Sequence, residues 1–309
     1  MKRLILLSVC LICIQTGKSC DFCNCYLGLN PGYNNNSIGI RWKNSHTFLQ
    51  GATQGLRVSH TEHGSGAEPL VGDWNEYENE LELYGRYYPH PKVQLMFTMP
   101  YSINSITYTS EQEHMNAFGD LFLQGFYQLA NTRAIDSSQT RHRLFAGGGI
   151  KFPTGKSSGT ASMDIPMSHH LLPGTGSTDY LAALSYIGKR QRLGWNADAS
   201  YKFNGSSATG YHYGNTFNLS GSGFYTFQSH KVAFYPHLGS AYETGLQDSF
   251  NGETIHSAGG ATTWGTAGCD FYVGTFAIAN QIRLPLLSVI PEGTPEDHIQ
   301  VALSFSYIF

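Results

Sequence analysis

Three cysteines near the start of the chain are the residues whose types and spacing are most suited to chemistry. Cys20, Cys23 and Cys25 form a C-x-x-C-x-C run. In an oxidising compartment two of these thiols can form a disulfide, which leaves the third for another role. As thiolates, the same residues suit a soft metal such as Cu(I) or Zn²⁺. A third interpretation is a lipidated Cys20, and the spacing alone does not choose among the three.

Histidine and methionine side chains gather in a polar stretch in the middle of the chain. His169 and His170 follow Met163 and Met167, and the chain has 13 histidines beside 19 lysines and arginines. Imidazole and thioether together suit copper, and imidazole alone suits zinc. The sequence therefore raises the hypothesis of a copper or zinc site, at the cysteines or at His169 and His170. The alternative is that polar surface loops tolerate histidine, and no other cofactor is indicated.

Residue types suited to catalysis occur without a catalytic motif around them. Ser168 precedes His169, and Ser257 follows His256. Adjacency in sequence does not create the geometry of a catalytic triad. The sequence contains no H-E-x-x-H, no G-x-S-x-G and no phosphate-binding glycine loop. We therefore assign no catalytic residue and expect the protein not to be an enzyme, with a lipid-modifying barrel enzyme as the alternative.

The first residues predict export from the cytoplasm. A basic start at Lys2 and Arg3 precedes an apolar run that ends at Ile14, and Gly17 and Ser19 supply the small residues of a cleavage site. This order is typical of a secretory signal peptide, and the run is too short to span a membrane as a helix. The predicted division is a signal peptide over residues 1–19, a cysteine-containing segment over 20–36 and one β-barrel domain over 37–309.

Composition and charge narrow the class of protein and partner. The formal net charge is -3, and removal of the basic signal makes it more negative. This argues against nucleic acid as a partner, because phosphate binding needs clustered positive charge. Only 13% of the residues are charged, against about a quarter in ordinary soluble domains. The 35 glycines, 19 tyrosines and 18 phenylalanines favour many strands joined by tight turns.

Apolar and polar residues alternate along many segments, most clearly at the C-terminus. Val301, Leu303, Phe305 and Tyr307 alternate with small or polar residues up to Phe309. One apolar face with a period of two is the pattern of a transmembrane β-barrel strand. A final aromatic residue is also the form of terminal strand that barrel assembly machinery recognises. We therefore expect a location in the bacterial outer membrane, with its lipids and this machinery as partners.

Segments of this kind recur along the chain, and their connections differ in length. Tight turns such as Pro89-His90-Pro91 alternate with long polar stretches such as 153–177 and 244–261. Short periplasmic turns, long external loops and an even strand number are typical of bacterial outer-membrane barrels. The sequence therefore predicts an all-β fold, a transmembrane antiparallel β-barrel of about 12 strands. The strands are expected near Ser37, Glu78, Lys92, Phe118, Thr140, Thr178, Arg192, Gly214, Lys231, Thr262, Thr275 and Asp297.

If the apolar faces meet lipid, the opposite faces of the same strands line the barrel interior. Opposite charges on the first two strands suggest cross-strand ion pairs. These charges are either a structural network or a selectivity lining for a polar or ionic solute. Phenylalanines on this face either line a path for aromatic or apolar solutes or pack a plugged interior. The predicted lining residues are Arg41, Glu80, Glu82, Arg86, Asp120, Phe122, Gln124, Phe126, Arg143, Lys151, Asp198, Lys202 and Arg283.

Five short blocks stand out in the middle third of the chain: FGDL at 118–121, YQL at 127–129, GIKFPTGK at 149–156, PGTGSTD at 173–179 and YKFNG at 201–205. As a set they resemble an outer-membrane family, the meta-pathway phenol-degradation proteins, often labelled transporters. The resemblance implies a barrel through which small, aromatic compounds cross the outer membrane. The C-x-x-C-x-C run at the start resembles a subgroup of this family found in Bacteroidetes.

Together these patterns predict an outer-membrane channel or transporter for small solutes, with aromatic or apolar compounds as the candidate cargo. Three alternatives remain: a copper- or zinc-handling barrel, a lipid-modifying barrel enzyme, and a structural or adhesive protein that displays its loops.

Overall fold

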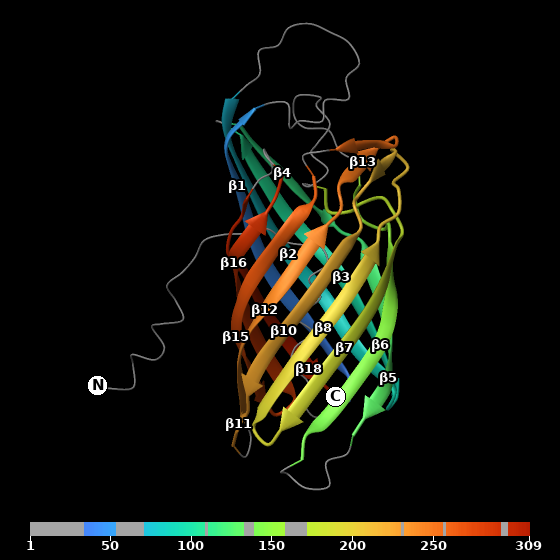
Figure 1. Cartoon of the computed structure of the whole chain (residues 1–309), viewed down its shortest axis with the longest axis vertical. Coiled ribbons are helices and arrows are strands. Elements are labelled where there is room, and N and C mark those ends of the chain that lie inside the picture. The colour runs from blue at the N-terminus through green and yellow to red at the C-terminus, as the bar shows by residue number, and fades with distance from the viewer. Residues whose placement is uncertain are drawn as a thin grey trace, which may run out of the picture.

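Strands account for most of the part of the chain that the structure describes. The computed structural model describes residues 34–53, 71–108, 111–132, 139–157, 172–229, 232–255, 258–291 and 296–309. Within these ranges, no helix is both long enough and apolar enough to cross a membrane. The strands lie side by side and form one tall, curved wall (Figure 1).

Twelve antiparallel strands close this wall into a barrel, which confirms the predicted fold. The strand that starts at Ser37 pairs with the strand that ends at Ile308, so the ring has no open edge. Closure is what lipid demands, because an unpaired backbone group has no water to bind there. In ring order the strands are β1 (Ser37–Thr53), β2 (Val71–His90), β3 (Val93–Tyr108), β5 (Leu121–Asn131), β6 (Arg141–Phe152), β7 (Asp179–Arg190), β8 (Leu193–Phe203), β10 (Thr216–Tyr225), β12 (Val232–Gly245), β15 (Gly260–Val273), β16 (Phe276–Val289) and β18 (Gln300–Ile308).

Shorter strands extend the barrel at its ends. β4 (Glu111–Phe118) continues the direction of β5 and pairs with the far part of β3. β11 (Phe227–Gln228) pairs with β12, and β17 (Glu296–Asp297) pairs with β1. Beyond the barrel wall, β9 (Tyr211–His212), β13 (Asp248–Phe250) and β14 (Glu253–Ile255) form a separate three-stranded sheet.

This small sheet refines the prediction that 244–261 is only a polar loop. β13 and β14 form a hairpin whose turn is Asn251-Gly252. Both turn residues have positive φ, at 49° and 87°, which is the conformation that Asn-Gly favours in a two-residue hairpin. The local signal was therefore present in the sequence, and the third strand, β9, comes from a different connection.

The outward faces of the strands carry exposed apolar side chains. Leu123 and Tyr127 on β5 are 43% and 49% exposed, whereas their neighbours Gln124 and Phe126 are buried. The same alternation runs along the other strands. Around one end of the barrel aromatic rings stack on the outer surface, as between Phe276 and Phe305. An apolar band with aromatic girdles is the surface that a lipid bilayer requires.

The two ends of the barrel differ in their connections. At one end the strands are joined by tight turns such as Pro91-Lys92 and Gln191-Arg192. At the other end the connections are long, as between β6 and β7. We call the first the short-turn end; in outer-membrane barrels it faces the periplasm. Residues 34–36 are fixed there, because the Phe309 N–H donates to the Asn36 carbonyl at 3.0 Å.

Candidate functional site

The predicted lining residues lie on inward faces of their strands, except Asp120, which is buried directly before β5. Arg86 and Asp198 are half-buried. In a wall one strand thick, side chains that alternate with the exposed apolar ones are buried inside the barrel. Their position is thus observed, while their role in selecting a solute stays a prediction. Those that are at least nine-tenths buried are Arg41, Glu80, Glu82, Asp120, Phe122, Gln124, Phe126, Arg143, Lys151, Lys202 and Arg283.

A first charged cluster lies between β1 and β2. The register places Arg41 opposite Glu82 and Lys43 opposite Glu80. The Arg41 guanidinium donates to Glu82, and the Lys43 ammonium lies 2.6 Å from Glu82 Oε1 and 3.0 Å from Glu80 Oε1. Two cations therefore face two carboxylates at short range, as the cross-strand pattern of the sequence suggested.

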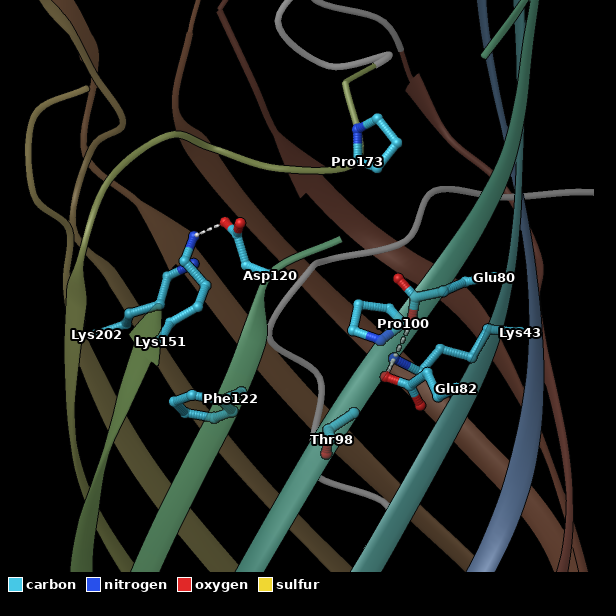
Figure 2. Close-up of a pocket in the computed structure, with 10 residues that line it drawn as sticks. All are labelled: Lys43, Glu80, Glu82, Thr98, Pro100, Asp120, Phe122, Lys151, Pro173 and Lys202. Carbon is cyan, nitrogen blue, oxygen red and sulfur yellow. Dashed lines mark hydrogen bonds and ion pairs between the residues drawn. The ribbon is translucent and has the colours of Figure 1, made fainter. Parts of the chain in front are cut away.

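A second charged cluster lies across β5, β6 and β7. The Lys151 ammonium lies 2.6 Å from Asp179 Oδ2 and 3.3 Å from Asp120 Oδ2. Asp179 is fully buried and also accepts a hydrogen bond from the Ser177 hydroxyl at 2.8 Å. Lys202, on β8, faces the same space (Figure 2). One end of this cluster therefore joins the barrel wall to the connection that follows β6.

Asp120 holds both stems of the connection between β6 and β7. Its carboxylate accepts the Gly155 N–H at 2.9 Å and the Thr175 N–H at 2.9 Å. The two stems also bind each other, because the Gly174 N–H donates to the Lys156 carbonyl at 3.0 Å. The stems of this connection, which the sequence predicted as a long polar stretch, therefore pack against Asp120. Residues 158–171 lie outside the described part of the chain.

A third charged cluster lies on the opposite wall. The Arg283 guanidinium donates to Glu243 at 2.6 Å and to Gln300 at 2.8 Å. Glu243 also accepts the indole N–H of Trp264 at 3.0 Å, and the guanidinium lies 4.6 Å from the centre of the Trp264 ring. Four strands thus contribute to one balanced, buried network.

A strip of apolar side chains faces inward on β3, β5, β6 and β7. Met96, Phe126 and Phe145 form one buried cluster, and Ala183 packs against it. Phe122 and Leu181 form a second cluster, which also contacts Ala183. Buried aromatic side chains are unusual in a lumen that is otherwise polar.

Two inward-facing glycines make room for this strip. A Cβ atom at Gly147 would lie 2.6 Å from the Phe126 ring, and one at Gly149 would lie 3.0 Å from the Phe122 ring. A Cβ at Gly147 would clash with the Phe126 ring, and one at Gly149 would require the Phe122 ring to shift, so the run Ala146-Gly147-Gly148-Gly149 lets two rings lie against the backbone of β6.

Open space of about 550 Å³, part of it continuous with solvent, lies between the first and second charged clusters. Glu80 and Glu82 border it on one side, and Asp120 and Phe122 border it on the other (Figure 2). The complete lining is Lys43, Glu80, Glu82, Thr98, Pro100, Asp120, Phe122, Lys151, Pro173 and Lys202.

The sequence did not single out four members of these clusters: Asp179, Glu243, Trp264 and Gln300. Each lies at an inward position of its strand, or at its first residue, in step with buried neighbours. The alternation along these strands is therefore the signal that identifies them. Trp264 departs from the expectation that an aromatic residue in a barrel strand faces lipid.

The candidate metal ligands are not placed by the structure. Cys20, Cys23, Cys25, His169 and His170 lie outside the described residues, so the copper or zinc hypothesis stays a prediction. Among the residues that are described, no three His, Cys, Asp or Glu side chains lie close enough to hold a metal ion. Cys269 is a free, half-buried thiol on β15.

No family model and no curated protein matches the chain. Among solved structures, it is similar to an outer membrane channel from Pseudomonas putida F1, with a TM-score of 0.60 and 12% identity over 91% of this chain and 100% of the other. The protein is a β-barrel of the bacterial outer membrane. At this identity the likeness concerns the fold, so the resemblance to the phenol-degradation family remains an interpretation.

Two further likenesses are looser. The translocator domain of the autotransporter NalP from Neisseria meningitidis has a TM-score of 0.46 and 10% identity, over 91% of this chain and 90% of the other. A TodX deletion mutant, described as a monoaromatic hydrocarbon channel, has a TM-score of 0.40 and 10% identity, over 90% and 91% of the two chains.

Proposed function

We propose that this barrel is a channel for small solutes that carry an aromatic or apolar group. One observation carries the proposal: open space inside the barrel is bordered by balanced charged clusters and by the inward-facing ring of Phe122. Charged walls keep the space hydrated, and an apolar strip lets a ring leave water on the way through. A lumen of this kind selects by width and by the groups that line it.

The balance of charge supports a cargo that is not strongly ionic where the clusters lie. Each cluster holds a cation, Lys43, Lys151 or Arg283, within 3.3 Å of a carboxylate. A further charge entering between them would have to compete with these pairs. A molecule that has an apolar part and at most a single charge meets less of this competition than a multiply charged one, and Phe122, Phe126 and Phe145 offer its apolar part buried contact.

The proposal is tested with the purified, folded barrel in proteoliposomes. We expect phenol to enter faster than glucose, and both to enter faster than in vesicles without protein. Single-channel recording in a planar bilayer should give defined current steps. Folding is verified for each sample by its resistance to unfolding in detergent before heating. Uptake no faster than in empty vesicles, from well-folded protein, would refute the proposal.

A matched pair of variants shows whether the solute passes along the apolar strip. Ala183 faces inward between the two apolar clusters, whereas its neighbour Ala182 faces outward and is exposed. Ala183→Trp should lower phenol uptake several-fold, because the indole fills the space beside Phe122 and Phe126. Ala182→Trp adds the same side chain on the lipid face and should leave uptake unchanged. Equal uptake by the two variants would exclude this route.

A further inference from the structure

Basic side chains gather inside the barrel at its short-turn end. Arg141 and Arg143 lie at inward positions near the start of β6, and Lys189 lies at an inward position near the end of β7. Arg141 and Lys189 are directly opposite each other in the register. Like charges in this arrangement destabilise a sheet. Arg86, on β2, is also close enough for its charge to act on Arg143.

Arg143 and Lys189 differ from the cations of the three charged clusters in what surrounds them. Arg143 is only 3% exposed, and its Nη2 donates to the side-chain oxygen of Asn34. Its Nε is buried without a hydrogen-bond partner in the described part of the chain. The Lys189 ammonium lies 6.0 Å from the centre of the Tyr235 ring. Within the described ranges, neither residue forms an ion pair with a carboxylate.

The apolar strip begins beside these cations. The Arg143 guanidinium lies 5.0 Å from the centre of the Phe145 ring. Phe145 in turn packs with Phe126 and Met96 in a buried cluster. A hydrogen-bond donor with a full positive charge therefore lies beside a buried cluster of apolar side chains.

We propose that the short-turn end of the lumen is a binding subsite for aromatic monocarboxylates. The carboxylate binds the Arg143 guanidinium, with Lys189 adding positive charge, and the ring packs against Phe145, Phe126 and Met96. A planar guanidinium with a free Nε–H suits a carboxylate, because the two can share parallel hydrogen bonds. The ligand also brings a negative charge to Arg143 and Lys189, which form no ion pair with a carboxylate within the described ranges. The inference deepens the proposed function, since it names a class of solute for the same lumen.

Binding is measured by calorimetry on the detergent-folded barrel, which separates this inference from conduction. The probes are benzoate, benzyl alcohol of similar size without charge, and acetate without a ring. We expect benzoate to bind more tightly than either. Arg143→Gln should weaken the binding of benzoate about tenfold, as expected for loss of a charge-assisted hydrogen bond. It should leave the affinity for benzyl alcohol unchanged. Arg192→Gln is the control, because it removes one exposed positive charge from a turn at the same end.

Two other variants keep the test decisive if Arg143→Gln does not fold. Lys189→Gln should weaken benzoate by a smaller factor. Arg143→Lys keeps the charge and loses the planar fork, so it should retain part of the affinity. The inference is overturned if benzoate does not bind, if it binds no better than benzyl alcohol or acetate, or if Arg143→Gln and Arg192→Gln bind it alike. A barrel that admits phenol yet shows such a result would retain its proposed function and lose this subsite.

Discussion

The two halves of the barrel interior differ in the groups that surround their cations. In the middle and toward the long-loop end, Lys43, Lys151 and Arg283 each lie within 3.0 Å of a buried carboxylate. At the short-turn end, Arg143 and Lys189 have no carboxylate partner among the described residues, and aromatic rings lie beside them instead.

This difference separates cations that form ion pairs within the wall from Arg143 and Lys189, which form none among the described residues. A buried ion pair offsets its own cost of desolvation, so it stabilises a conformation and offers little to a ligand. A buried cation without a counter-charge is costly to the fold by itself, and the cost falls when an anion binds. The comparison therefore predicts opposite consequences for removing a charge in the two halves.

The largest effect is expected at Arg283. Arg283→Met leaves the buried Glu243 carboxylate without its cation. It should lower the free energy of unfolding by about 3 kcal/mol, as when one partner of a buried pair is removed. Urea unfolding of the barrel in lipid vesicles measures this. Adding Glu243→Gln to the variant should restore part of the loss, and an unchanged unfolding midpoint in Arg283→Met would contradict the structural role.

A smaller loss of stability is expected at Asp120, because its partner Lys151 also pairs with a second carboxylate. Lys151 keeps Asp179 at 2.6 Å, but the Gly155 and Thr175 N–H groups lose a charged acceptor. Asp120→Asn should lower the free energy of unfolding by about 1–2 kcal/mol and raise single-channel conductance, because the stems of the β6–β7 connection are held less firmly. Glu253→Gln, an exposed carboxylate on β14, is the control. Equal conductance in the two variants would show that Asp120 does not limit conductance through the barrel.

Outside the membrane, the three-stranded sheet contains a hydrogen bond that senses alkaline pH. The Tyr211 hydroxyl donates to Asp248 at 2.6 Å, and burial together with the Asp248 charge raises the pKa of Tyr211. The stabilisation is fully present below the ordinary tyrosine pKa of about 10 and is lost as pH rises above it, because the unfolded chain ionises first.

The raised pKa of Tyr211 can be measured by following the ultraviolet absorbance of tyrosinate as the pH is raised. Up to about one unit above the ordinary value of about 10, wild type and Tyr211→Phe should gain the same absorbance, since Tyr211 is not yet ionised. At neutral pH protease should cleave the variant faster in the hairpin at Asn251-Gly252. Loss of the hydrogen bond lowers the free energy of local unfolding of this sheet by about 1 kcal/mol. A larger absorbance gain in the wild type over this range would show that Tyr211 titrates normally.

The smallest effect on stability is expected at Lys189, where the comparison is sharpest. Lys189→Gln removes a cation that faces Arg141 across the two strands. The free energy of unfolding should change by less than about 0.5 kcal/mol, or rise slightly, because like-charge repulsion is relieved. In a salt gradient the reversal potential should shift toward cation preference, more than in Arg192→Gln. A loss of stability like that of Arg283→Met would mean that Lys189 has a structural partner after all.

Much of the barrel could be predicted because its signal is local. The period of two decides which side chains of a strand share a face, so the alternation around Leu123 and Phe126 indicated both the lipid face and the interior. The pairing of Arg41 with Glu82 was predictable in kind, because opposite charges on neighbouring strands follow from that same alternation.

Other contacts of the interior join residues that no local pattern connects. Arg283 on β16 reaches Glu243 on β12 across the intervening strand β15. Asp120 gathers two stems that stand twenty residues apart in sequence, at Gly155 and Thr175. These contacts depend on the curvature of the closed wall and on the path of a long connection, and a periodic pattern contains neither.

The sequence by itself determined that this protein is a lipid-facing barrel, because the alternation of apolar and polar residues is a property of each single strand. Only the tertiary structure decided which interior charges are paired and which are not. That outcome depends on distances across the lumen, set by strand register and closure, and Coulomb energy changes over a few ångströms. Arg143 and Arg283 look alike in sequence, but among the described residues Arg283 pairs with the Glu243 carboxylate, whereas Arg143 donates to the side chain of Asn34.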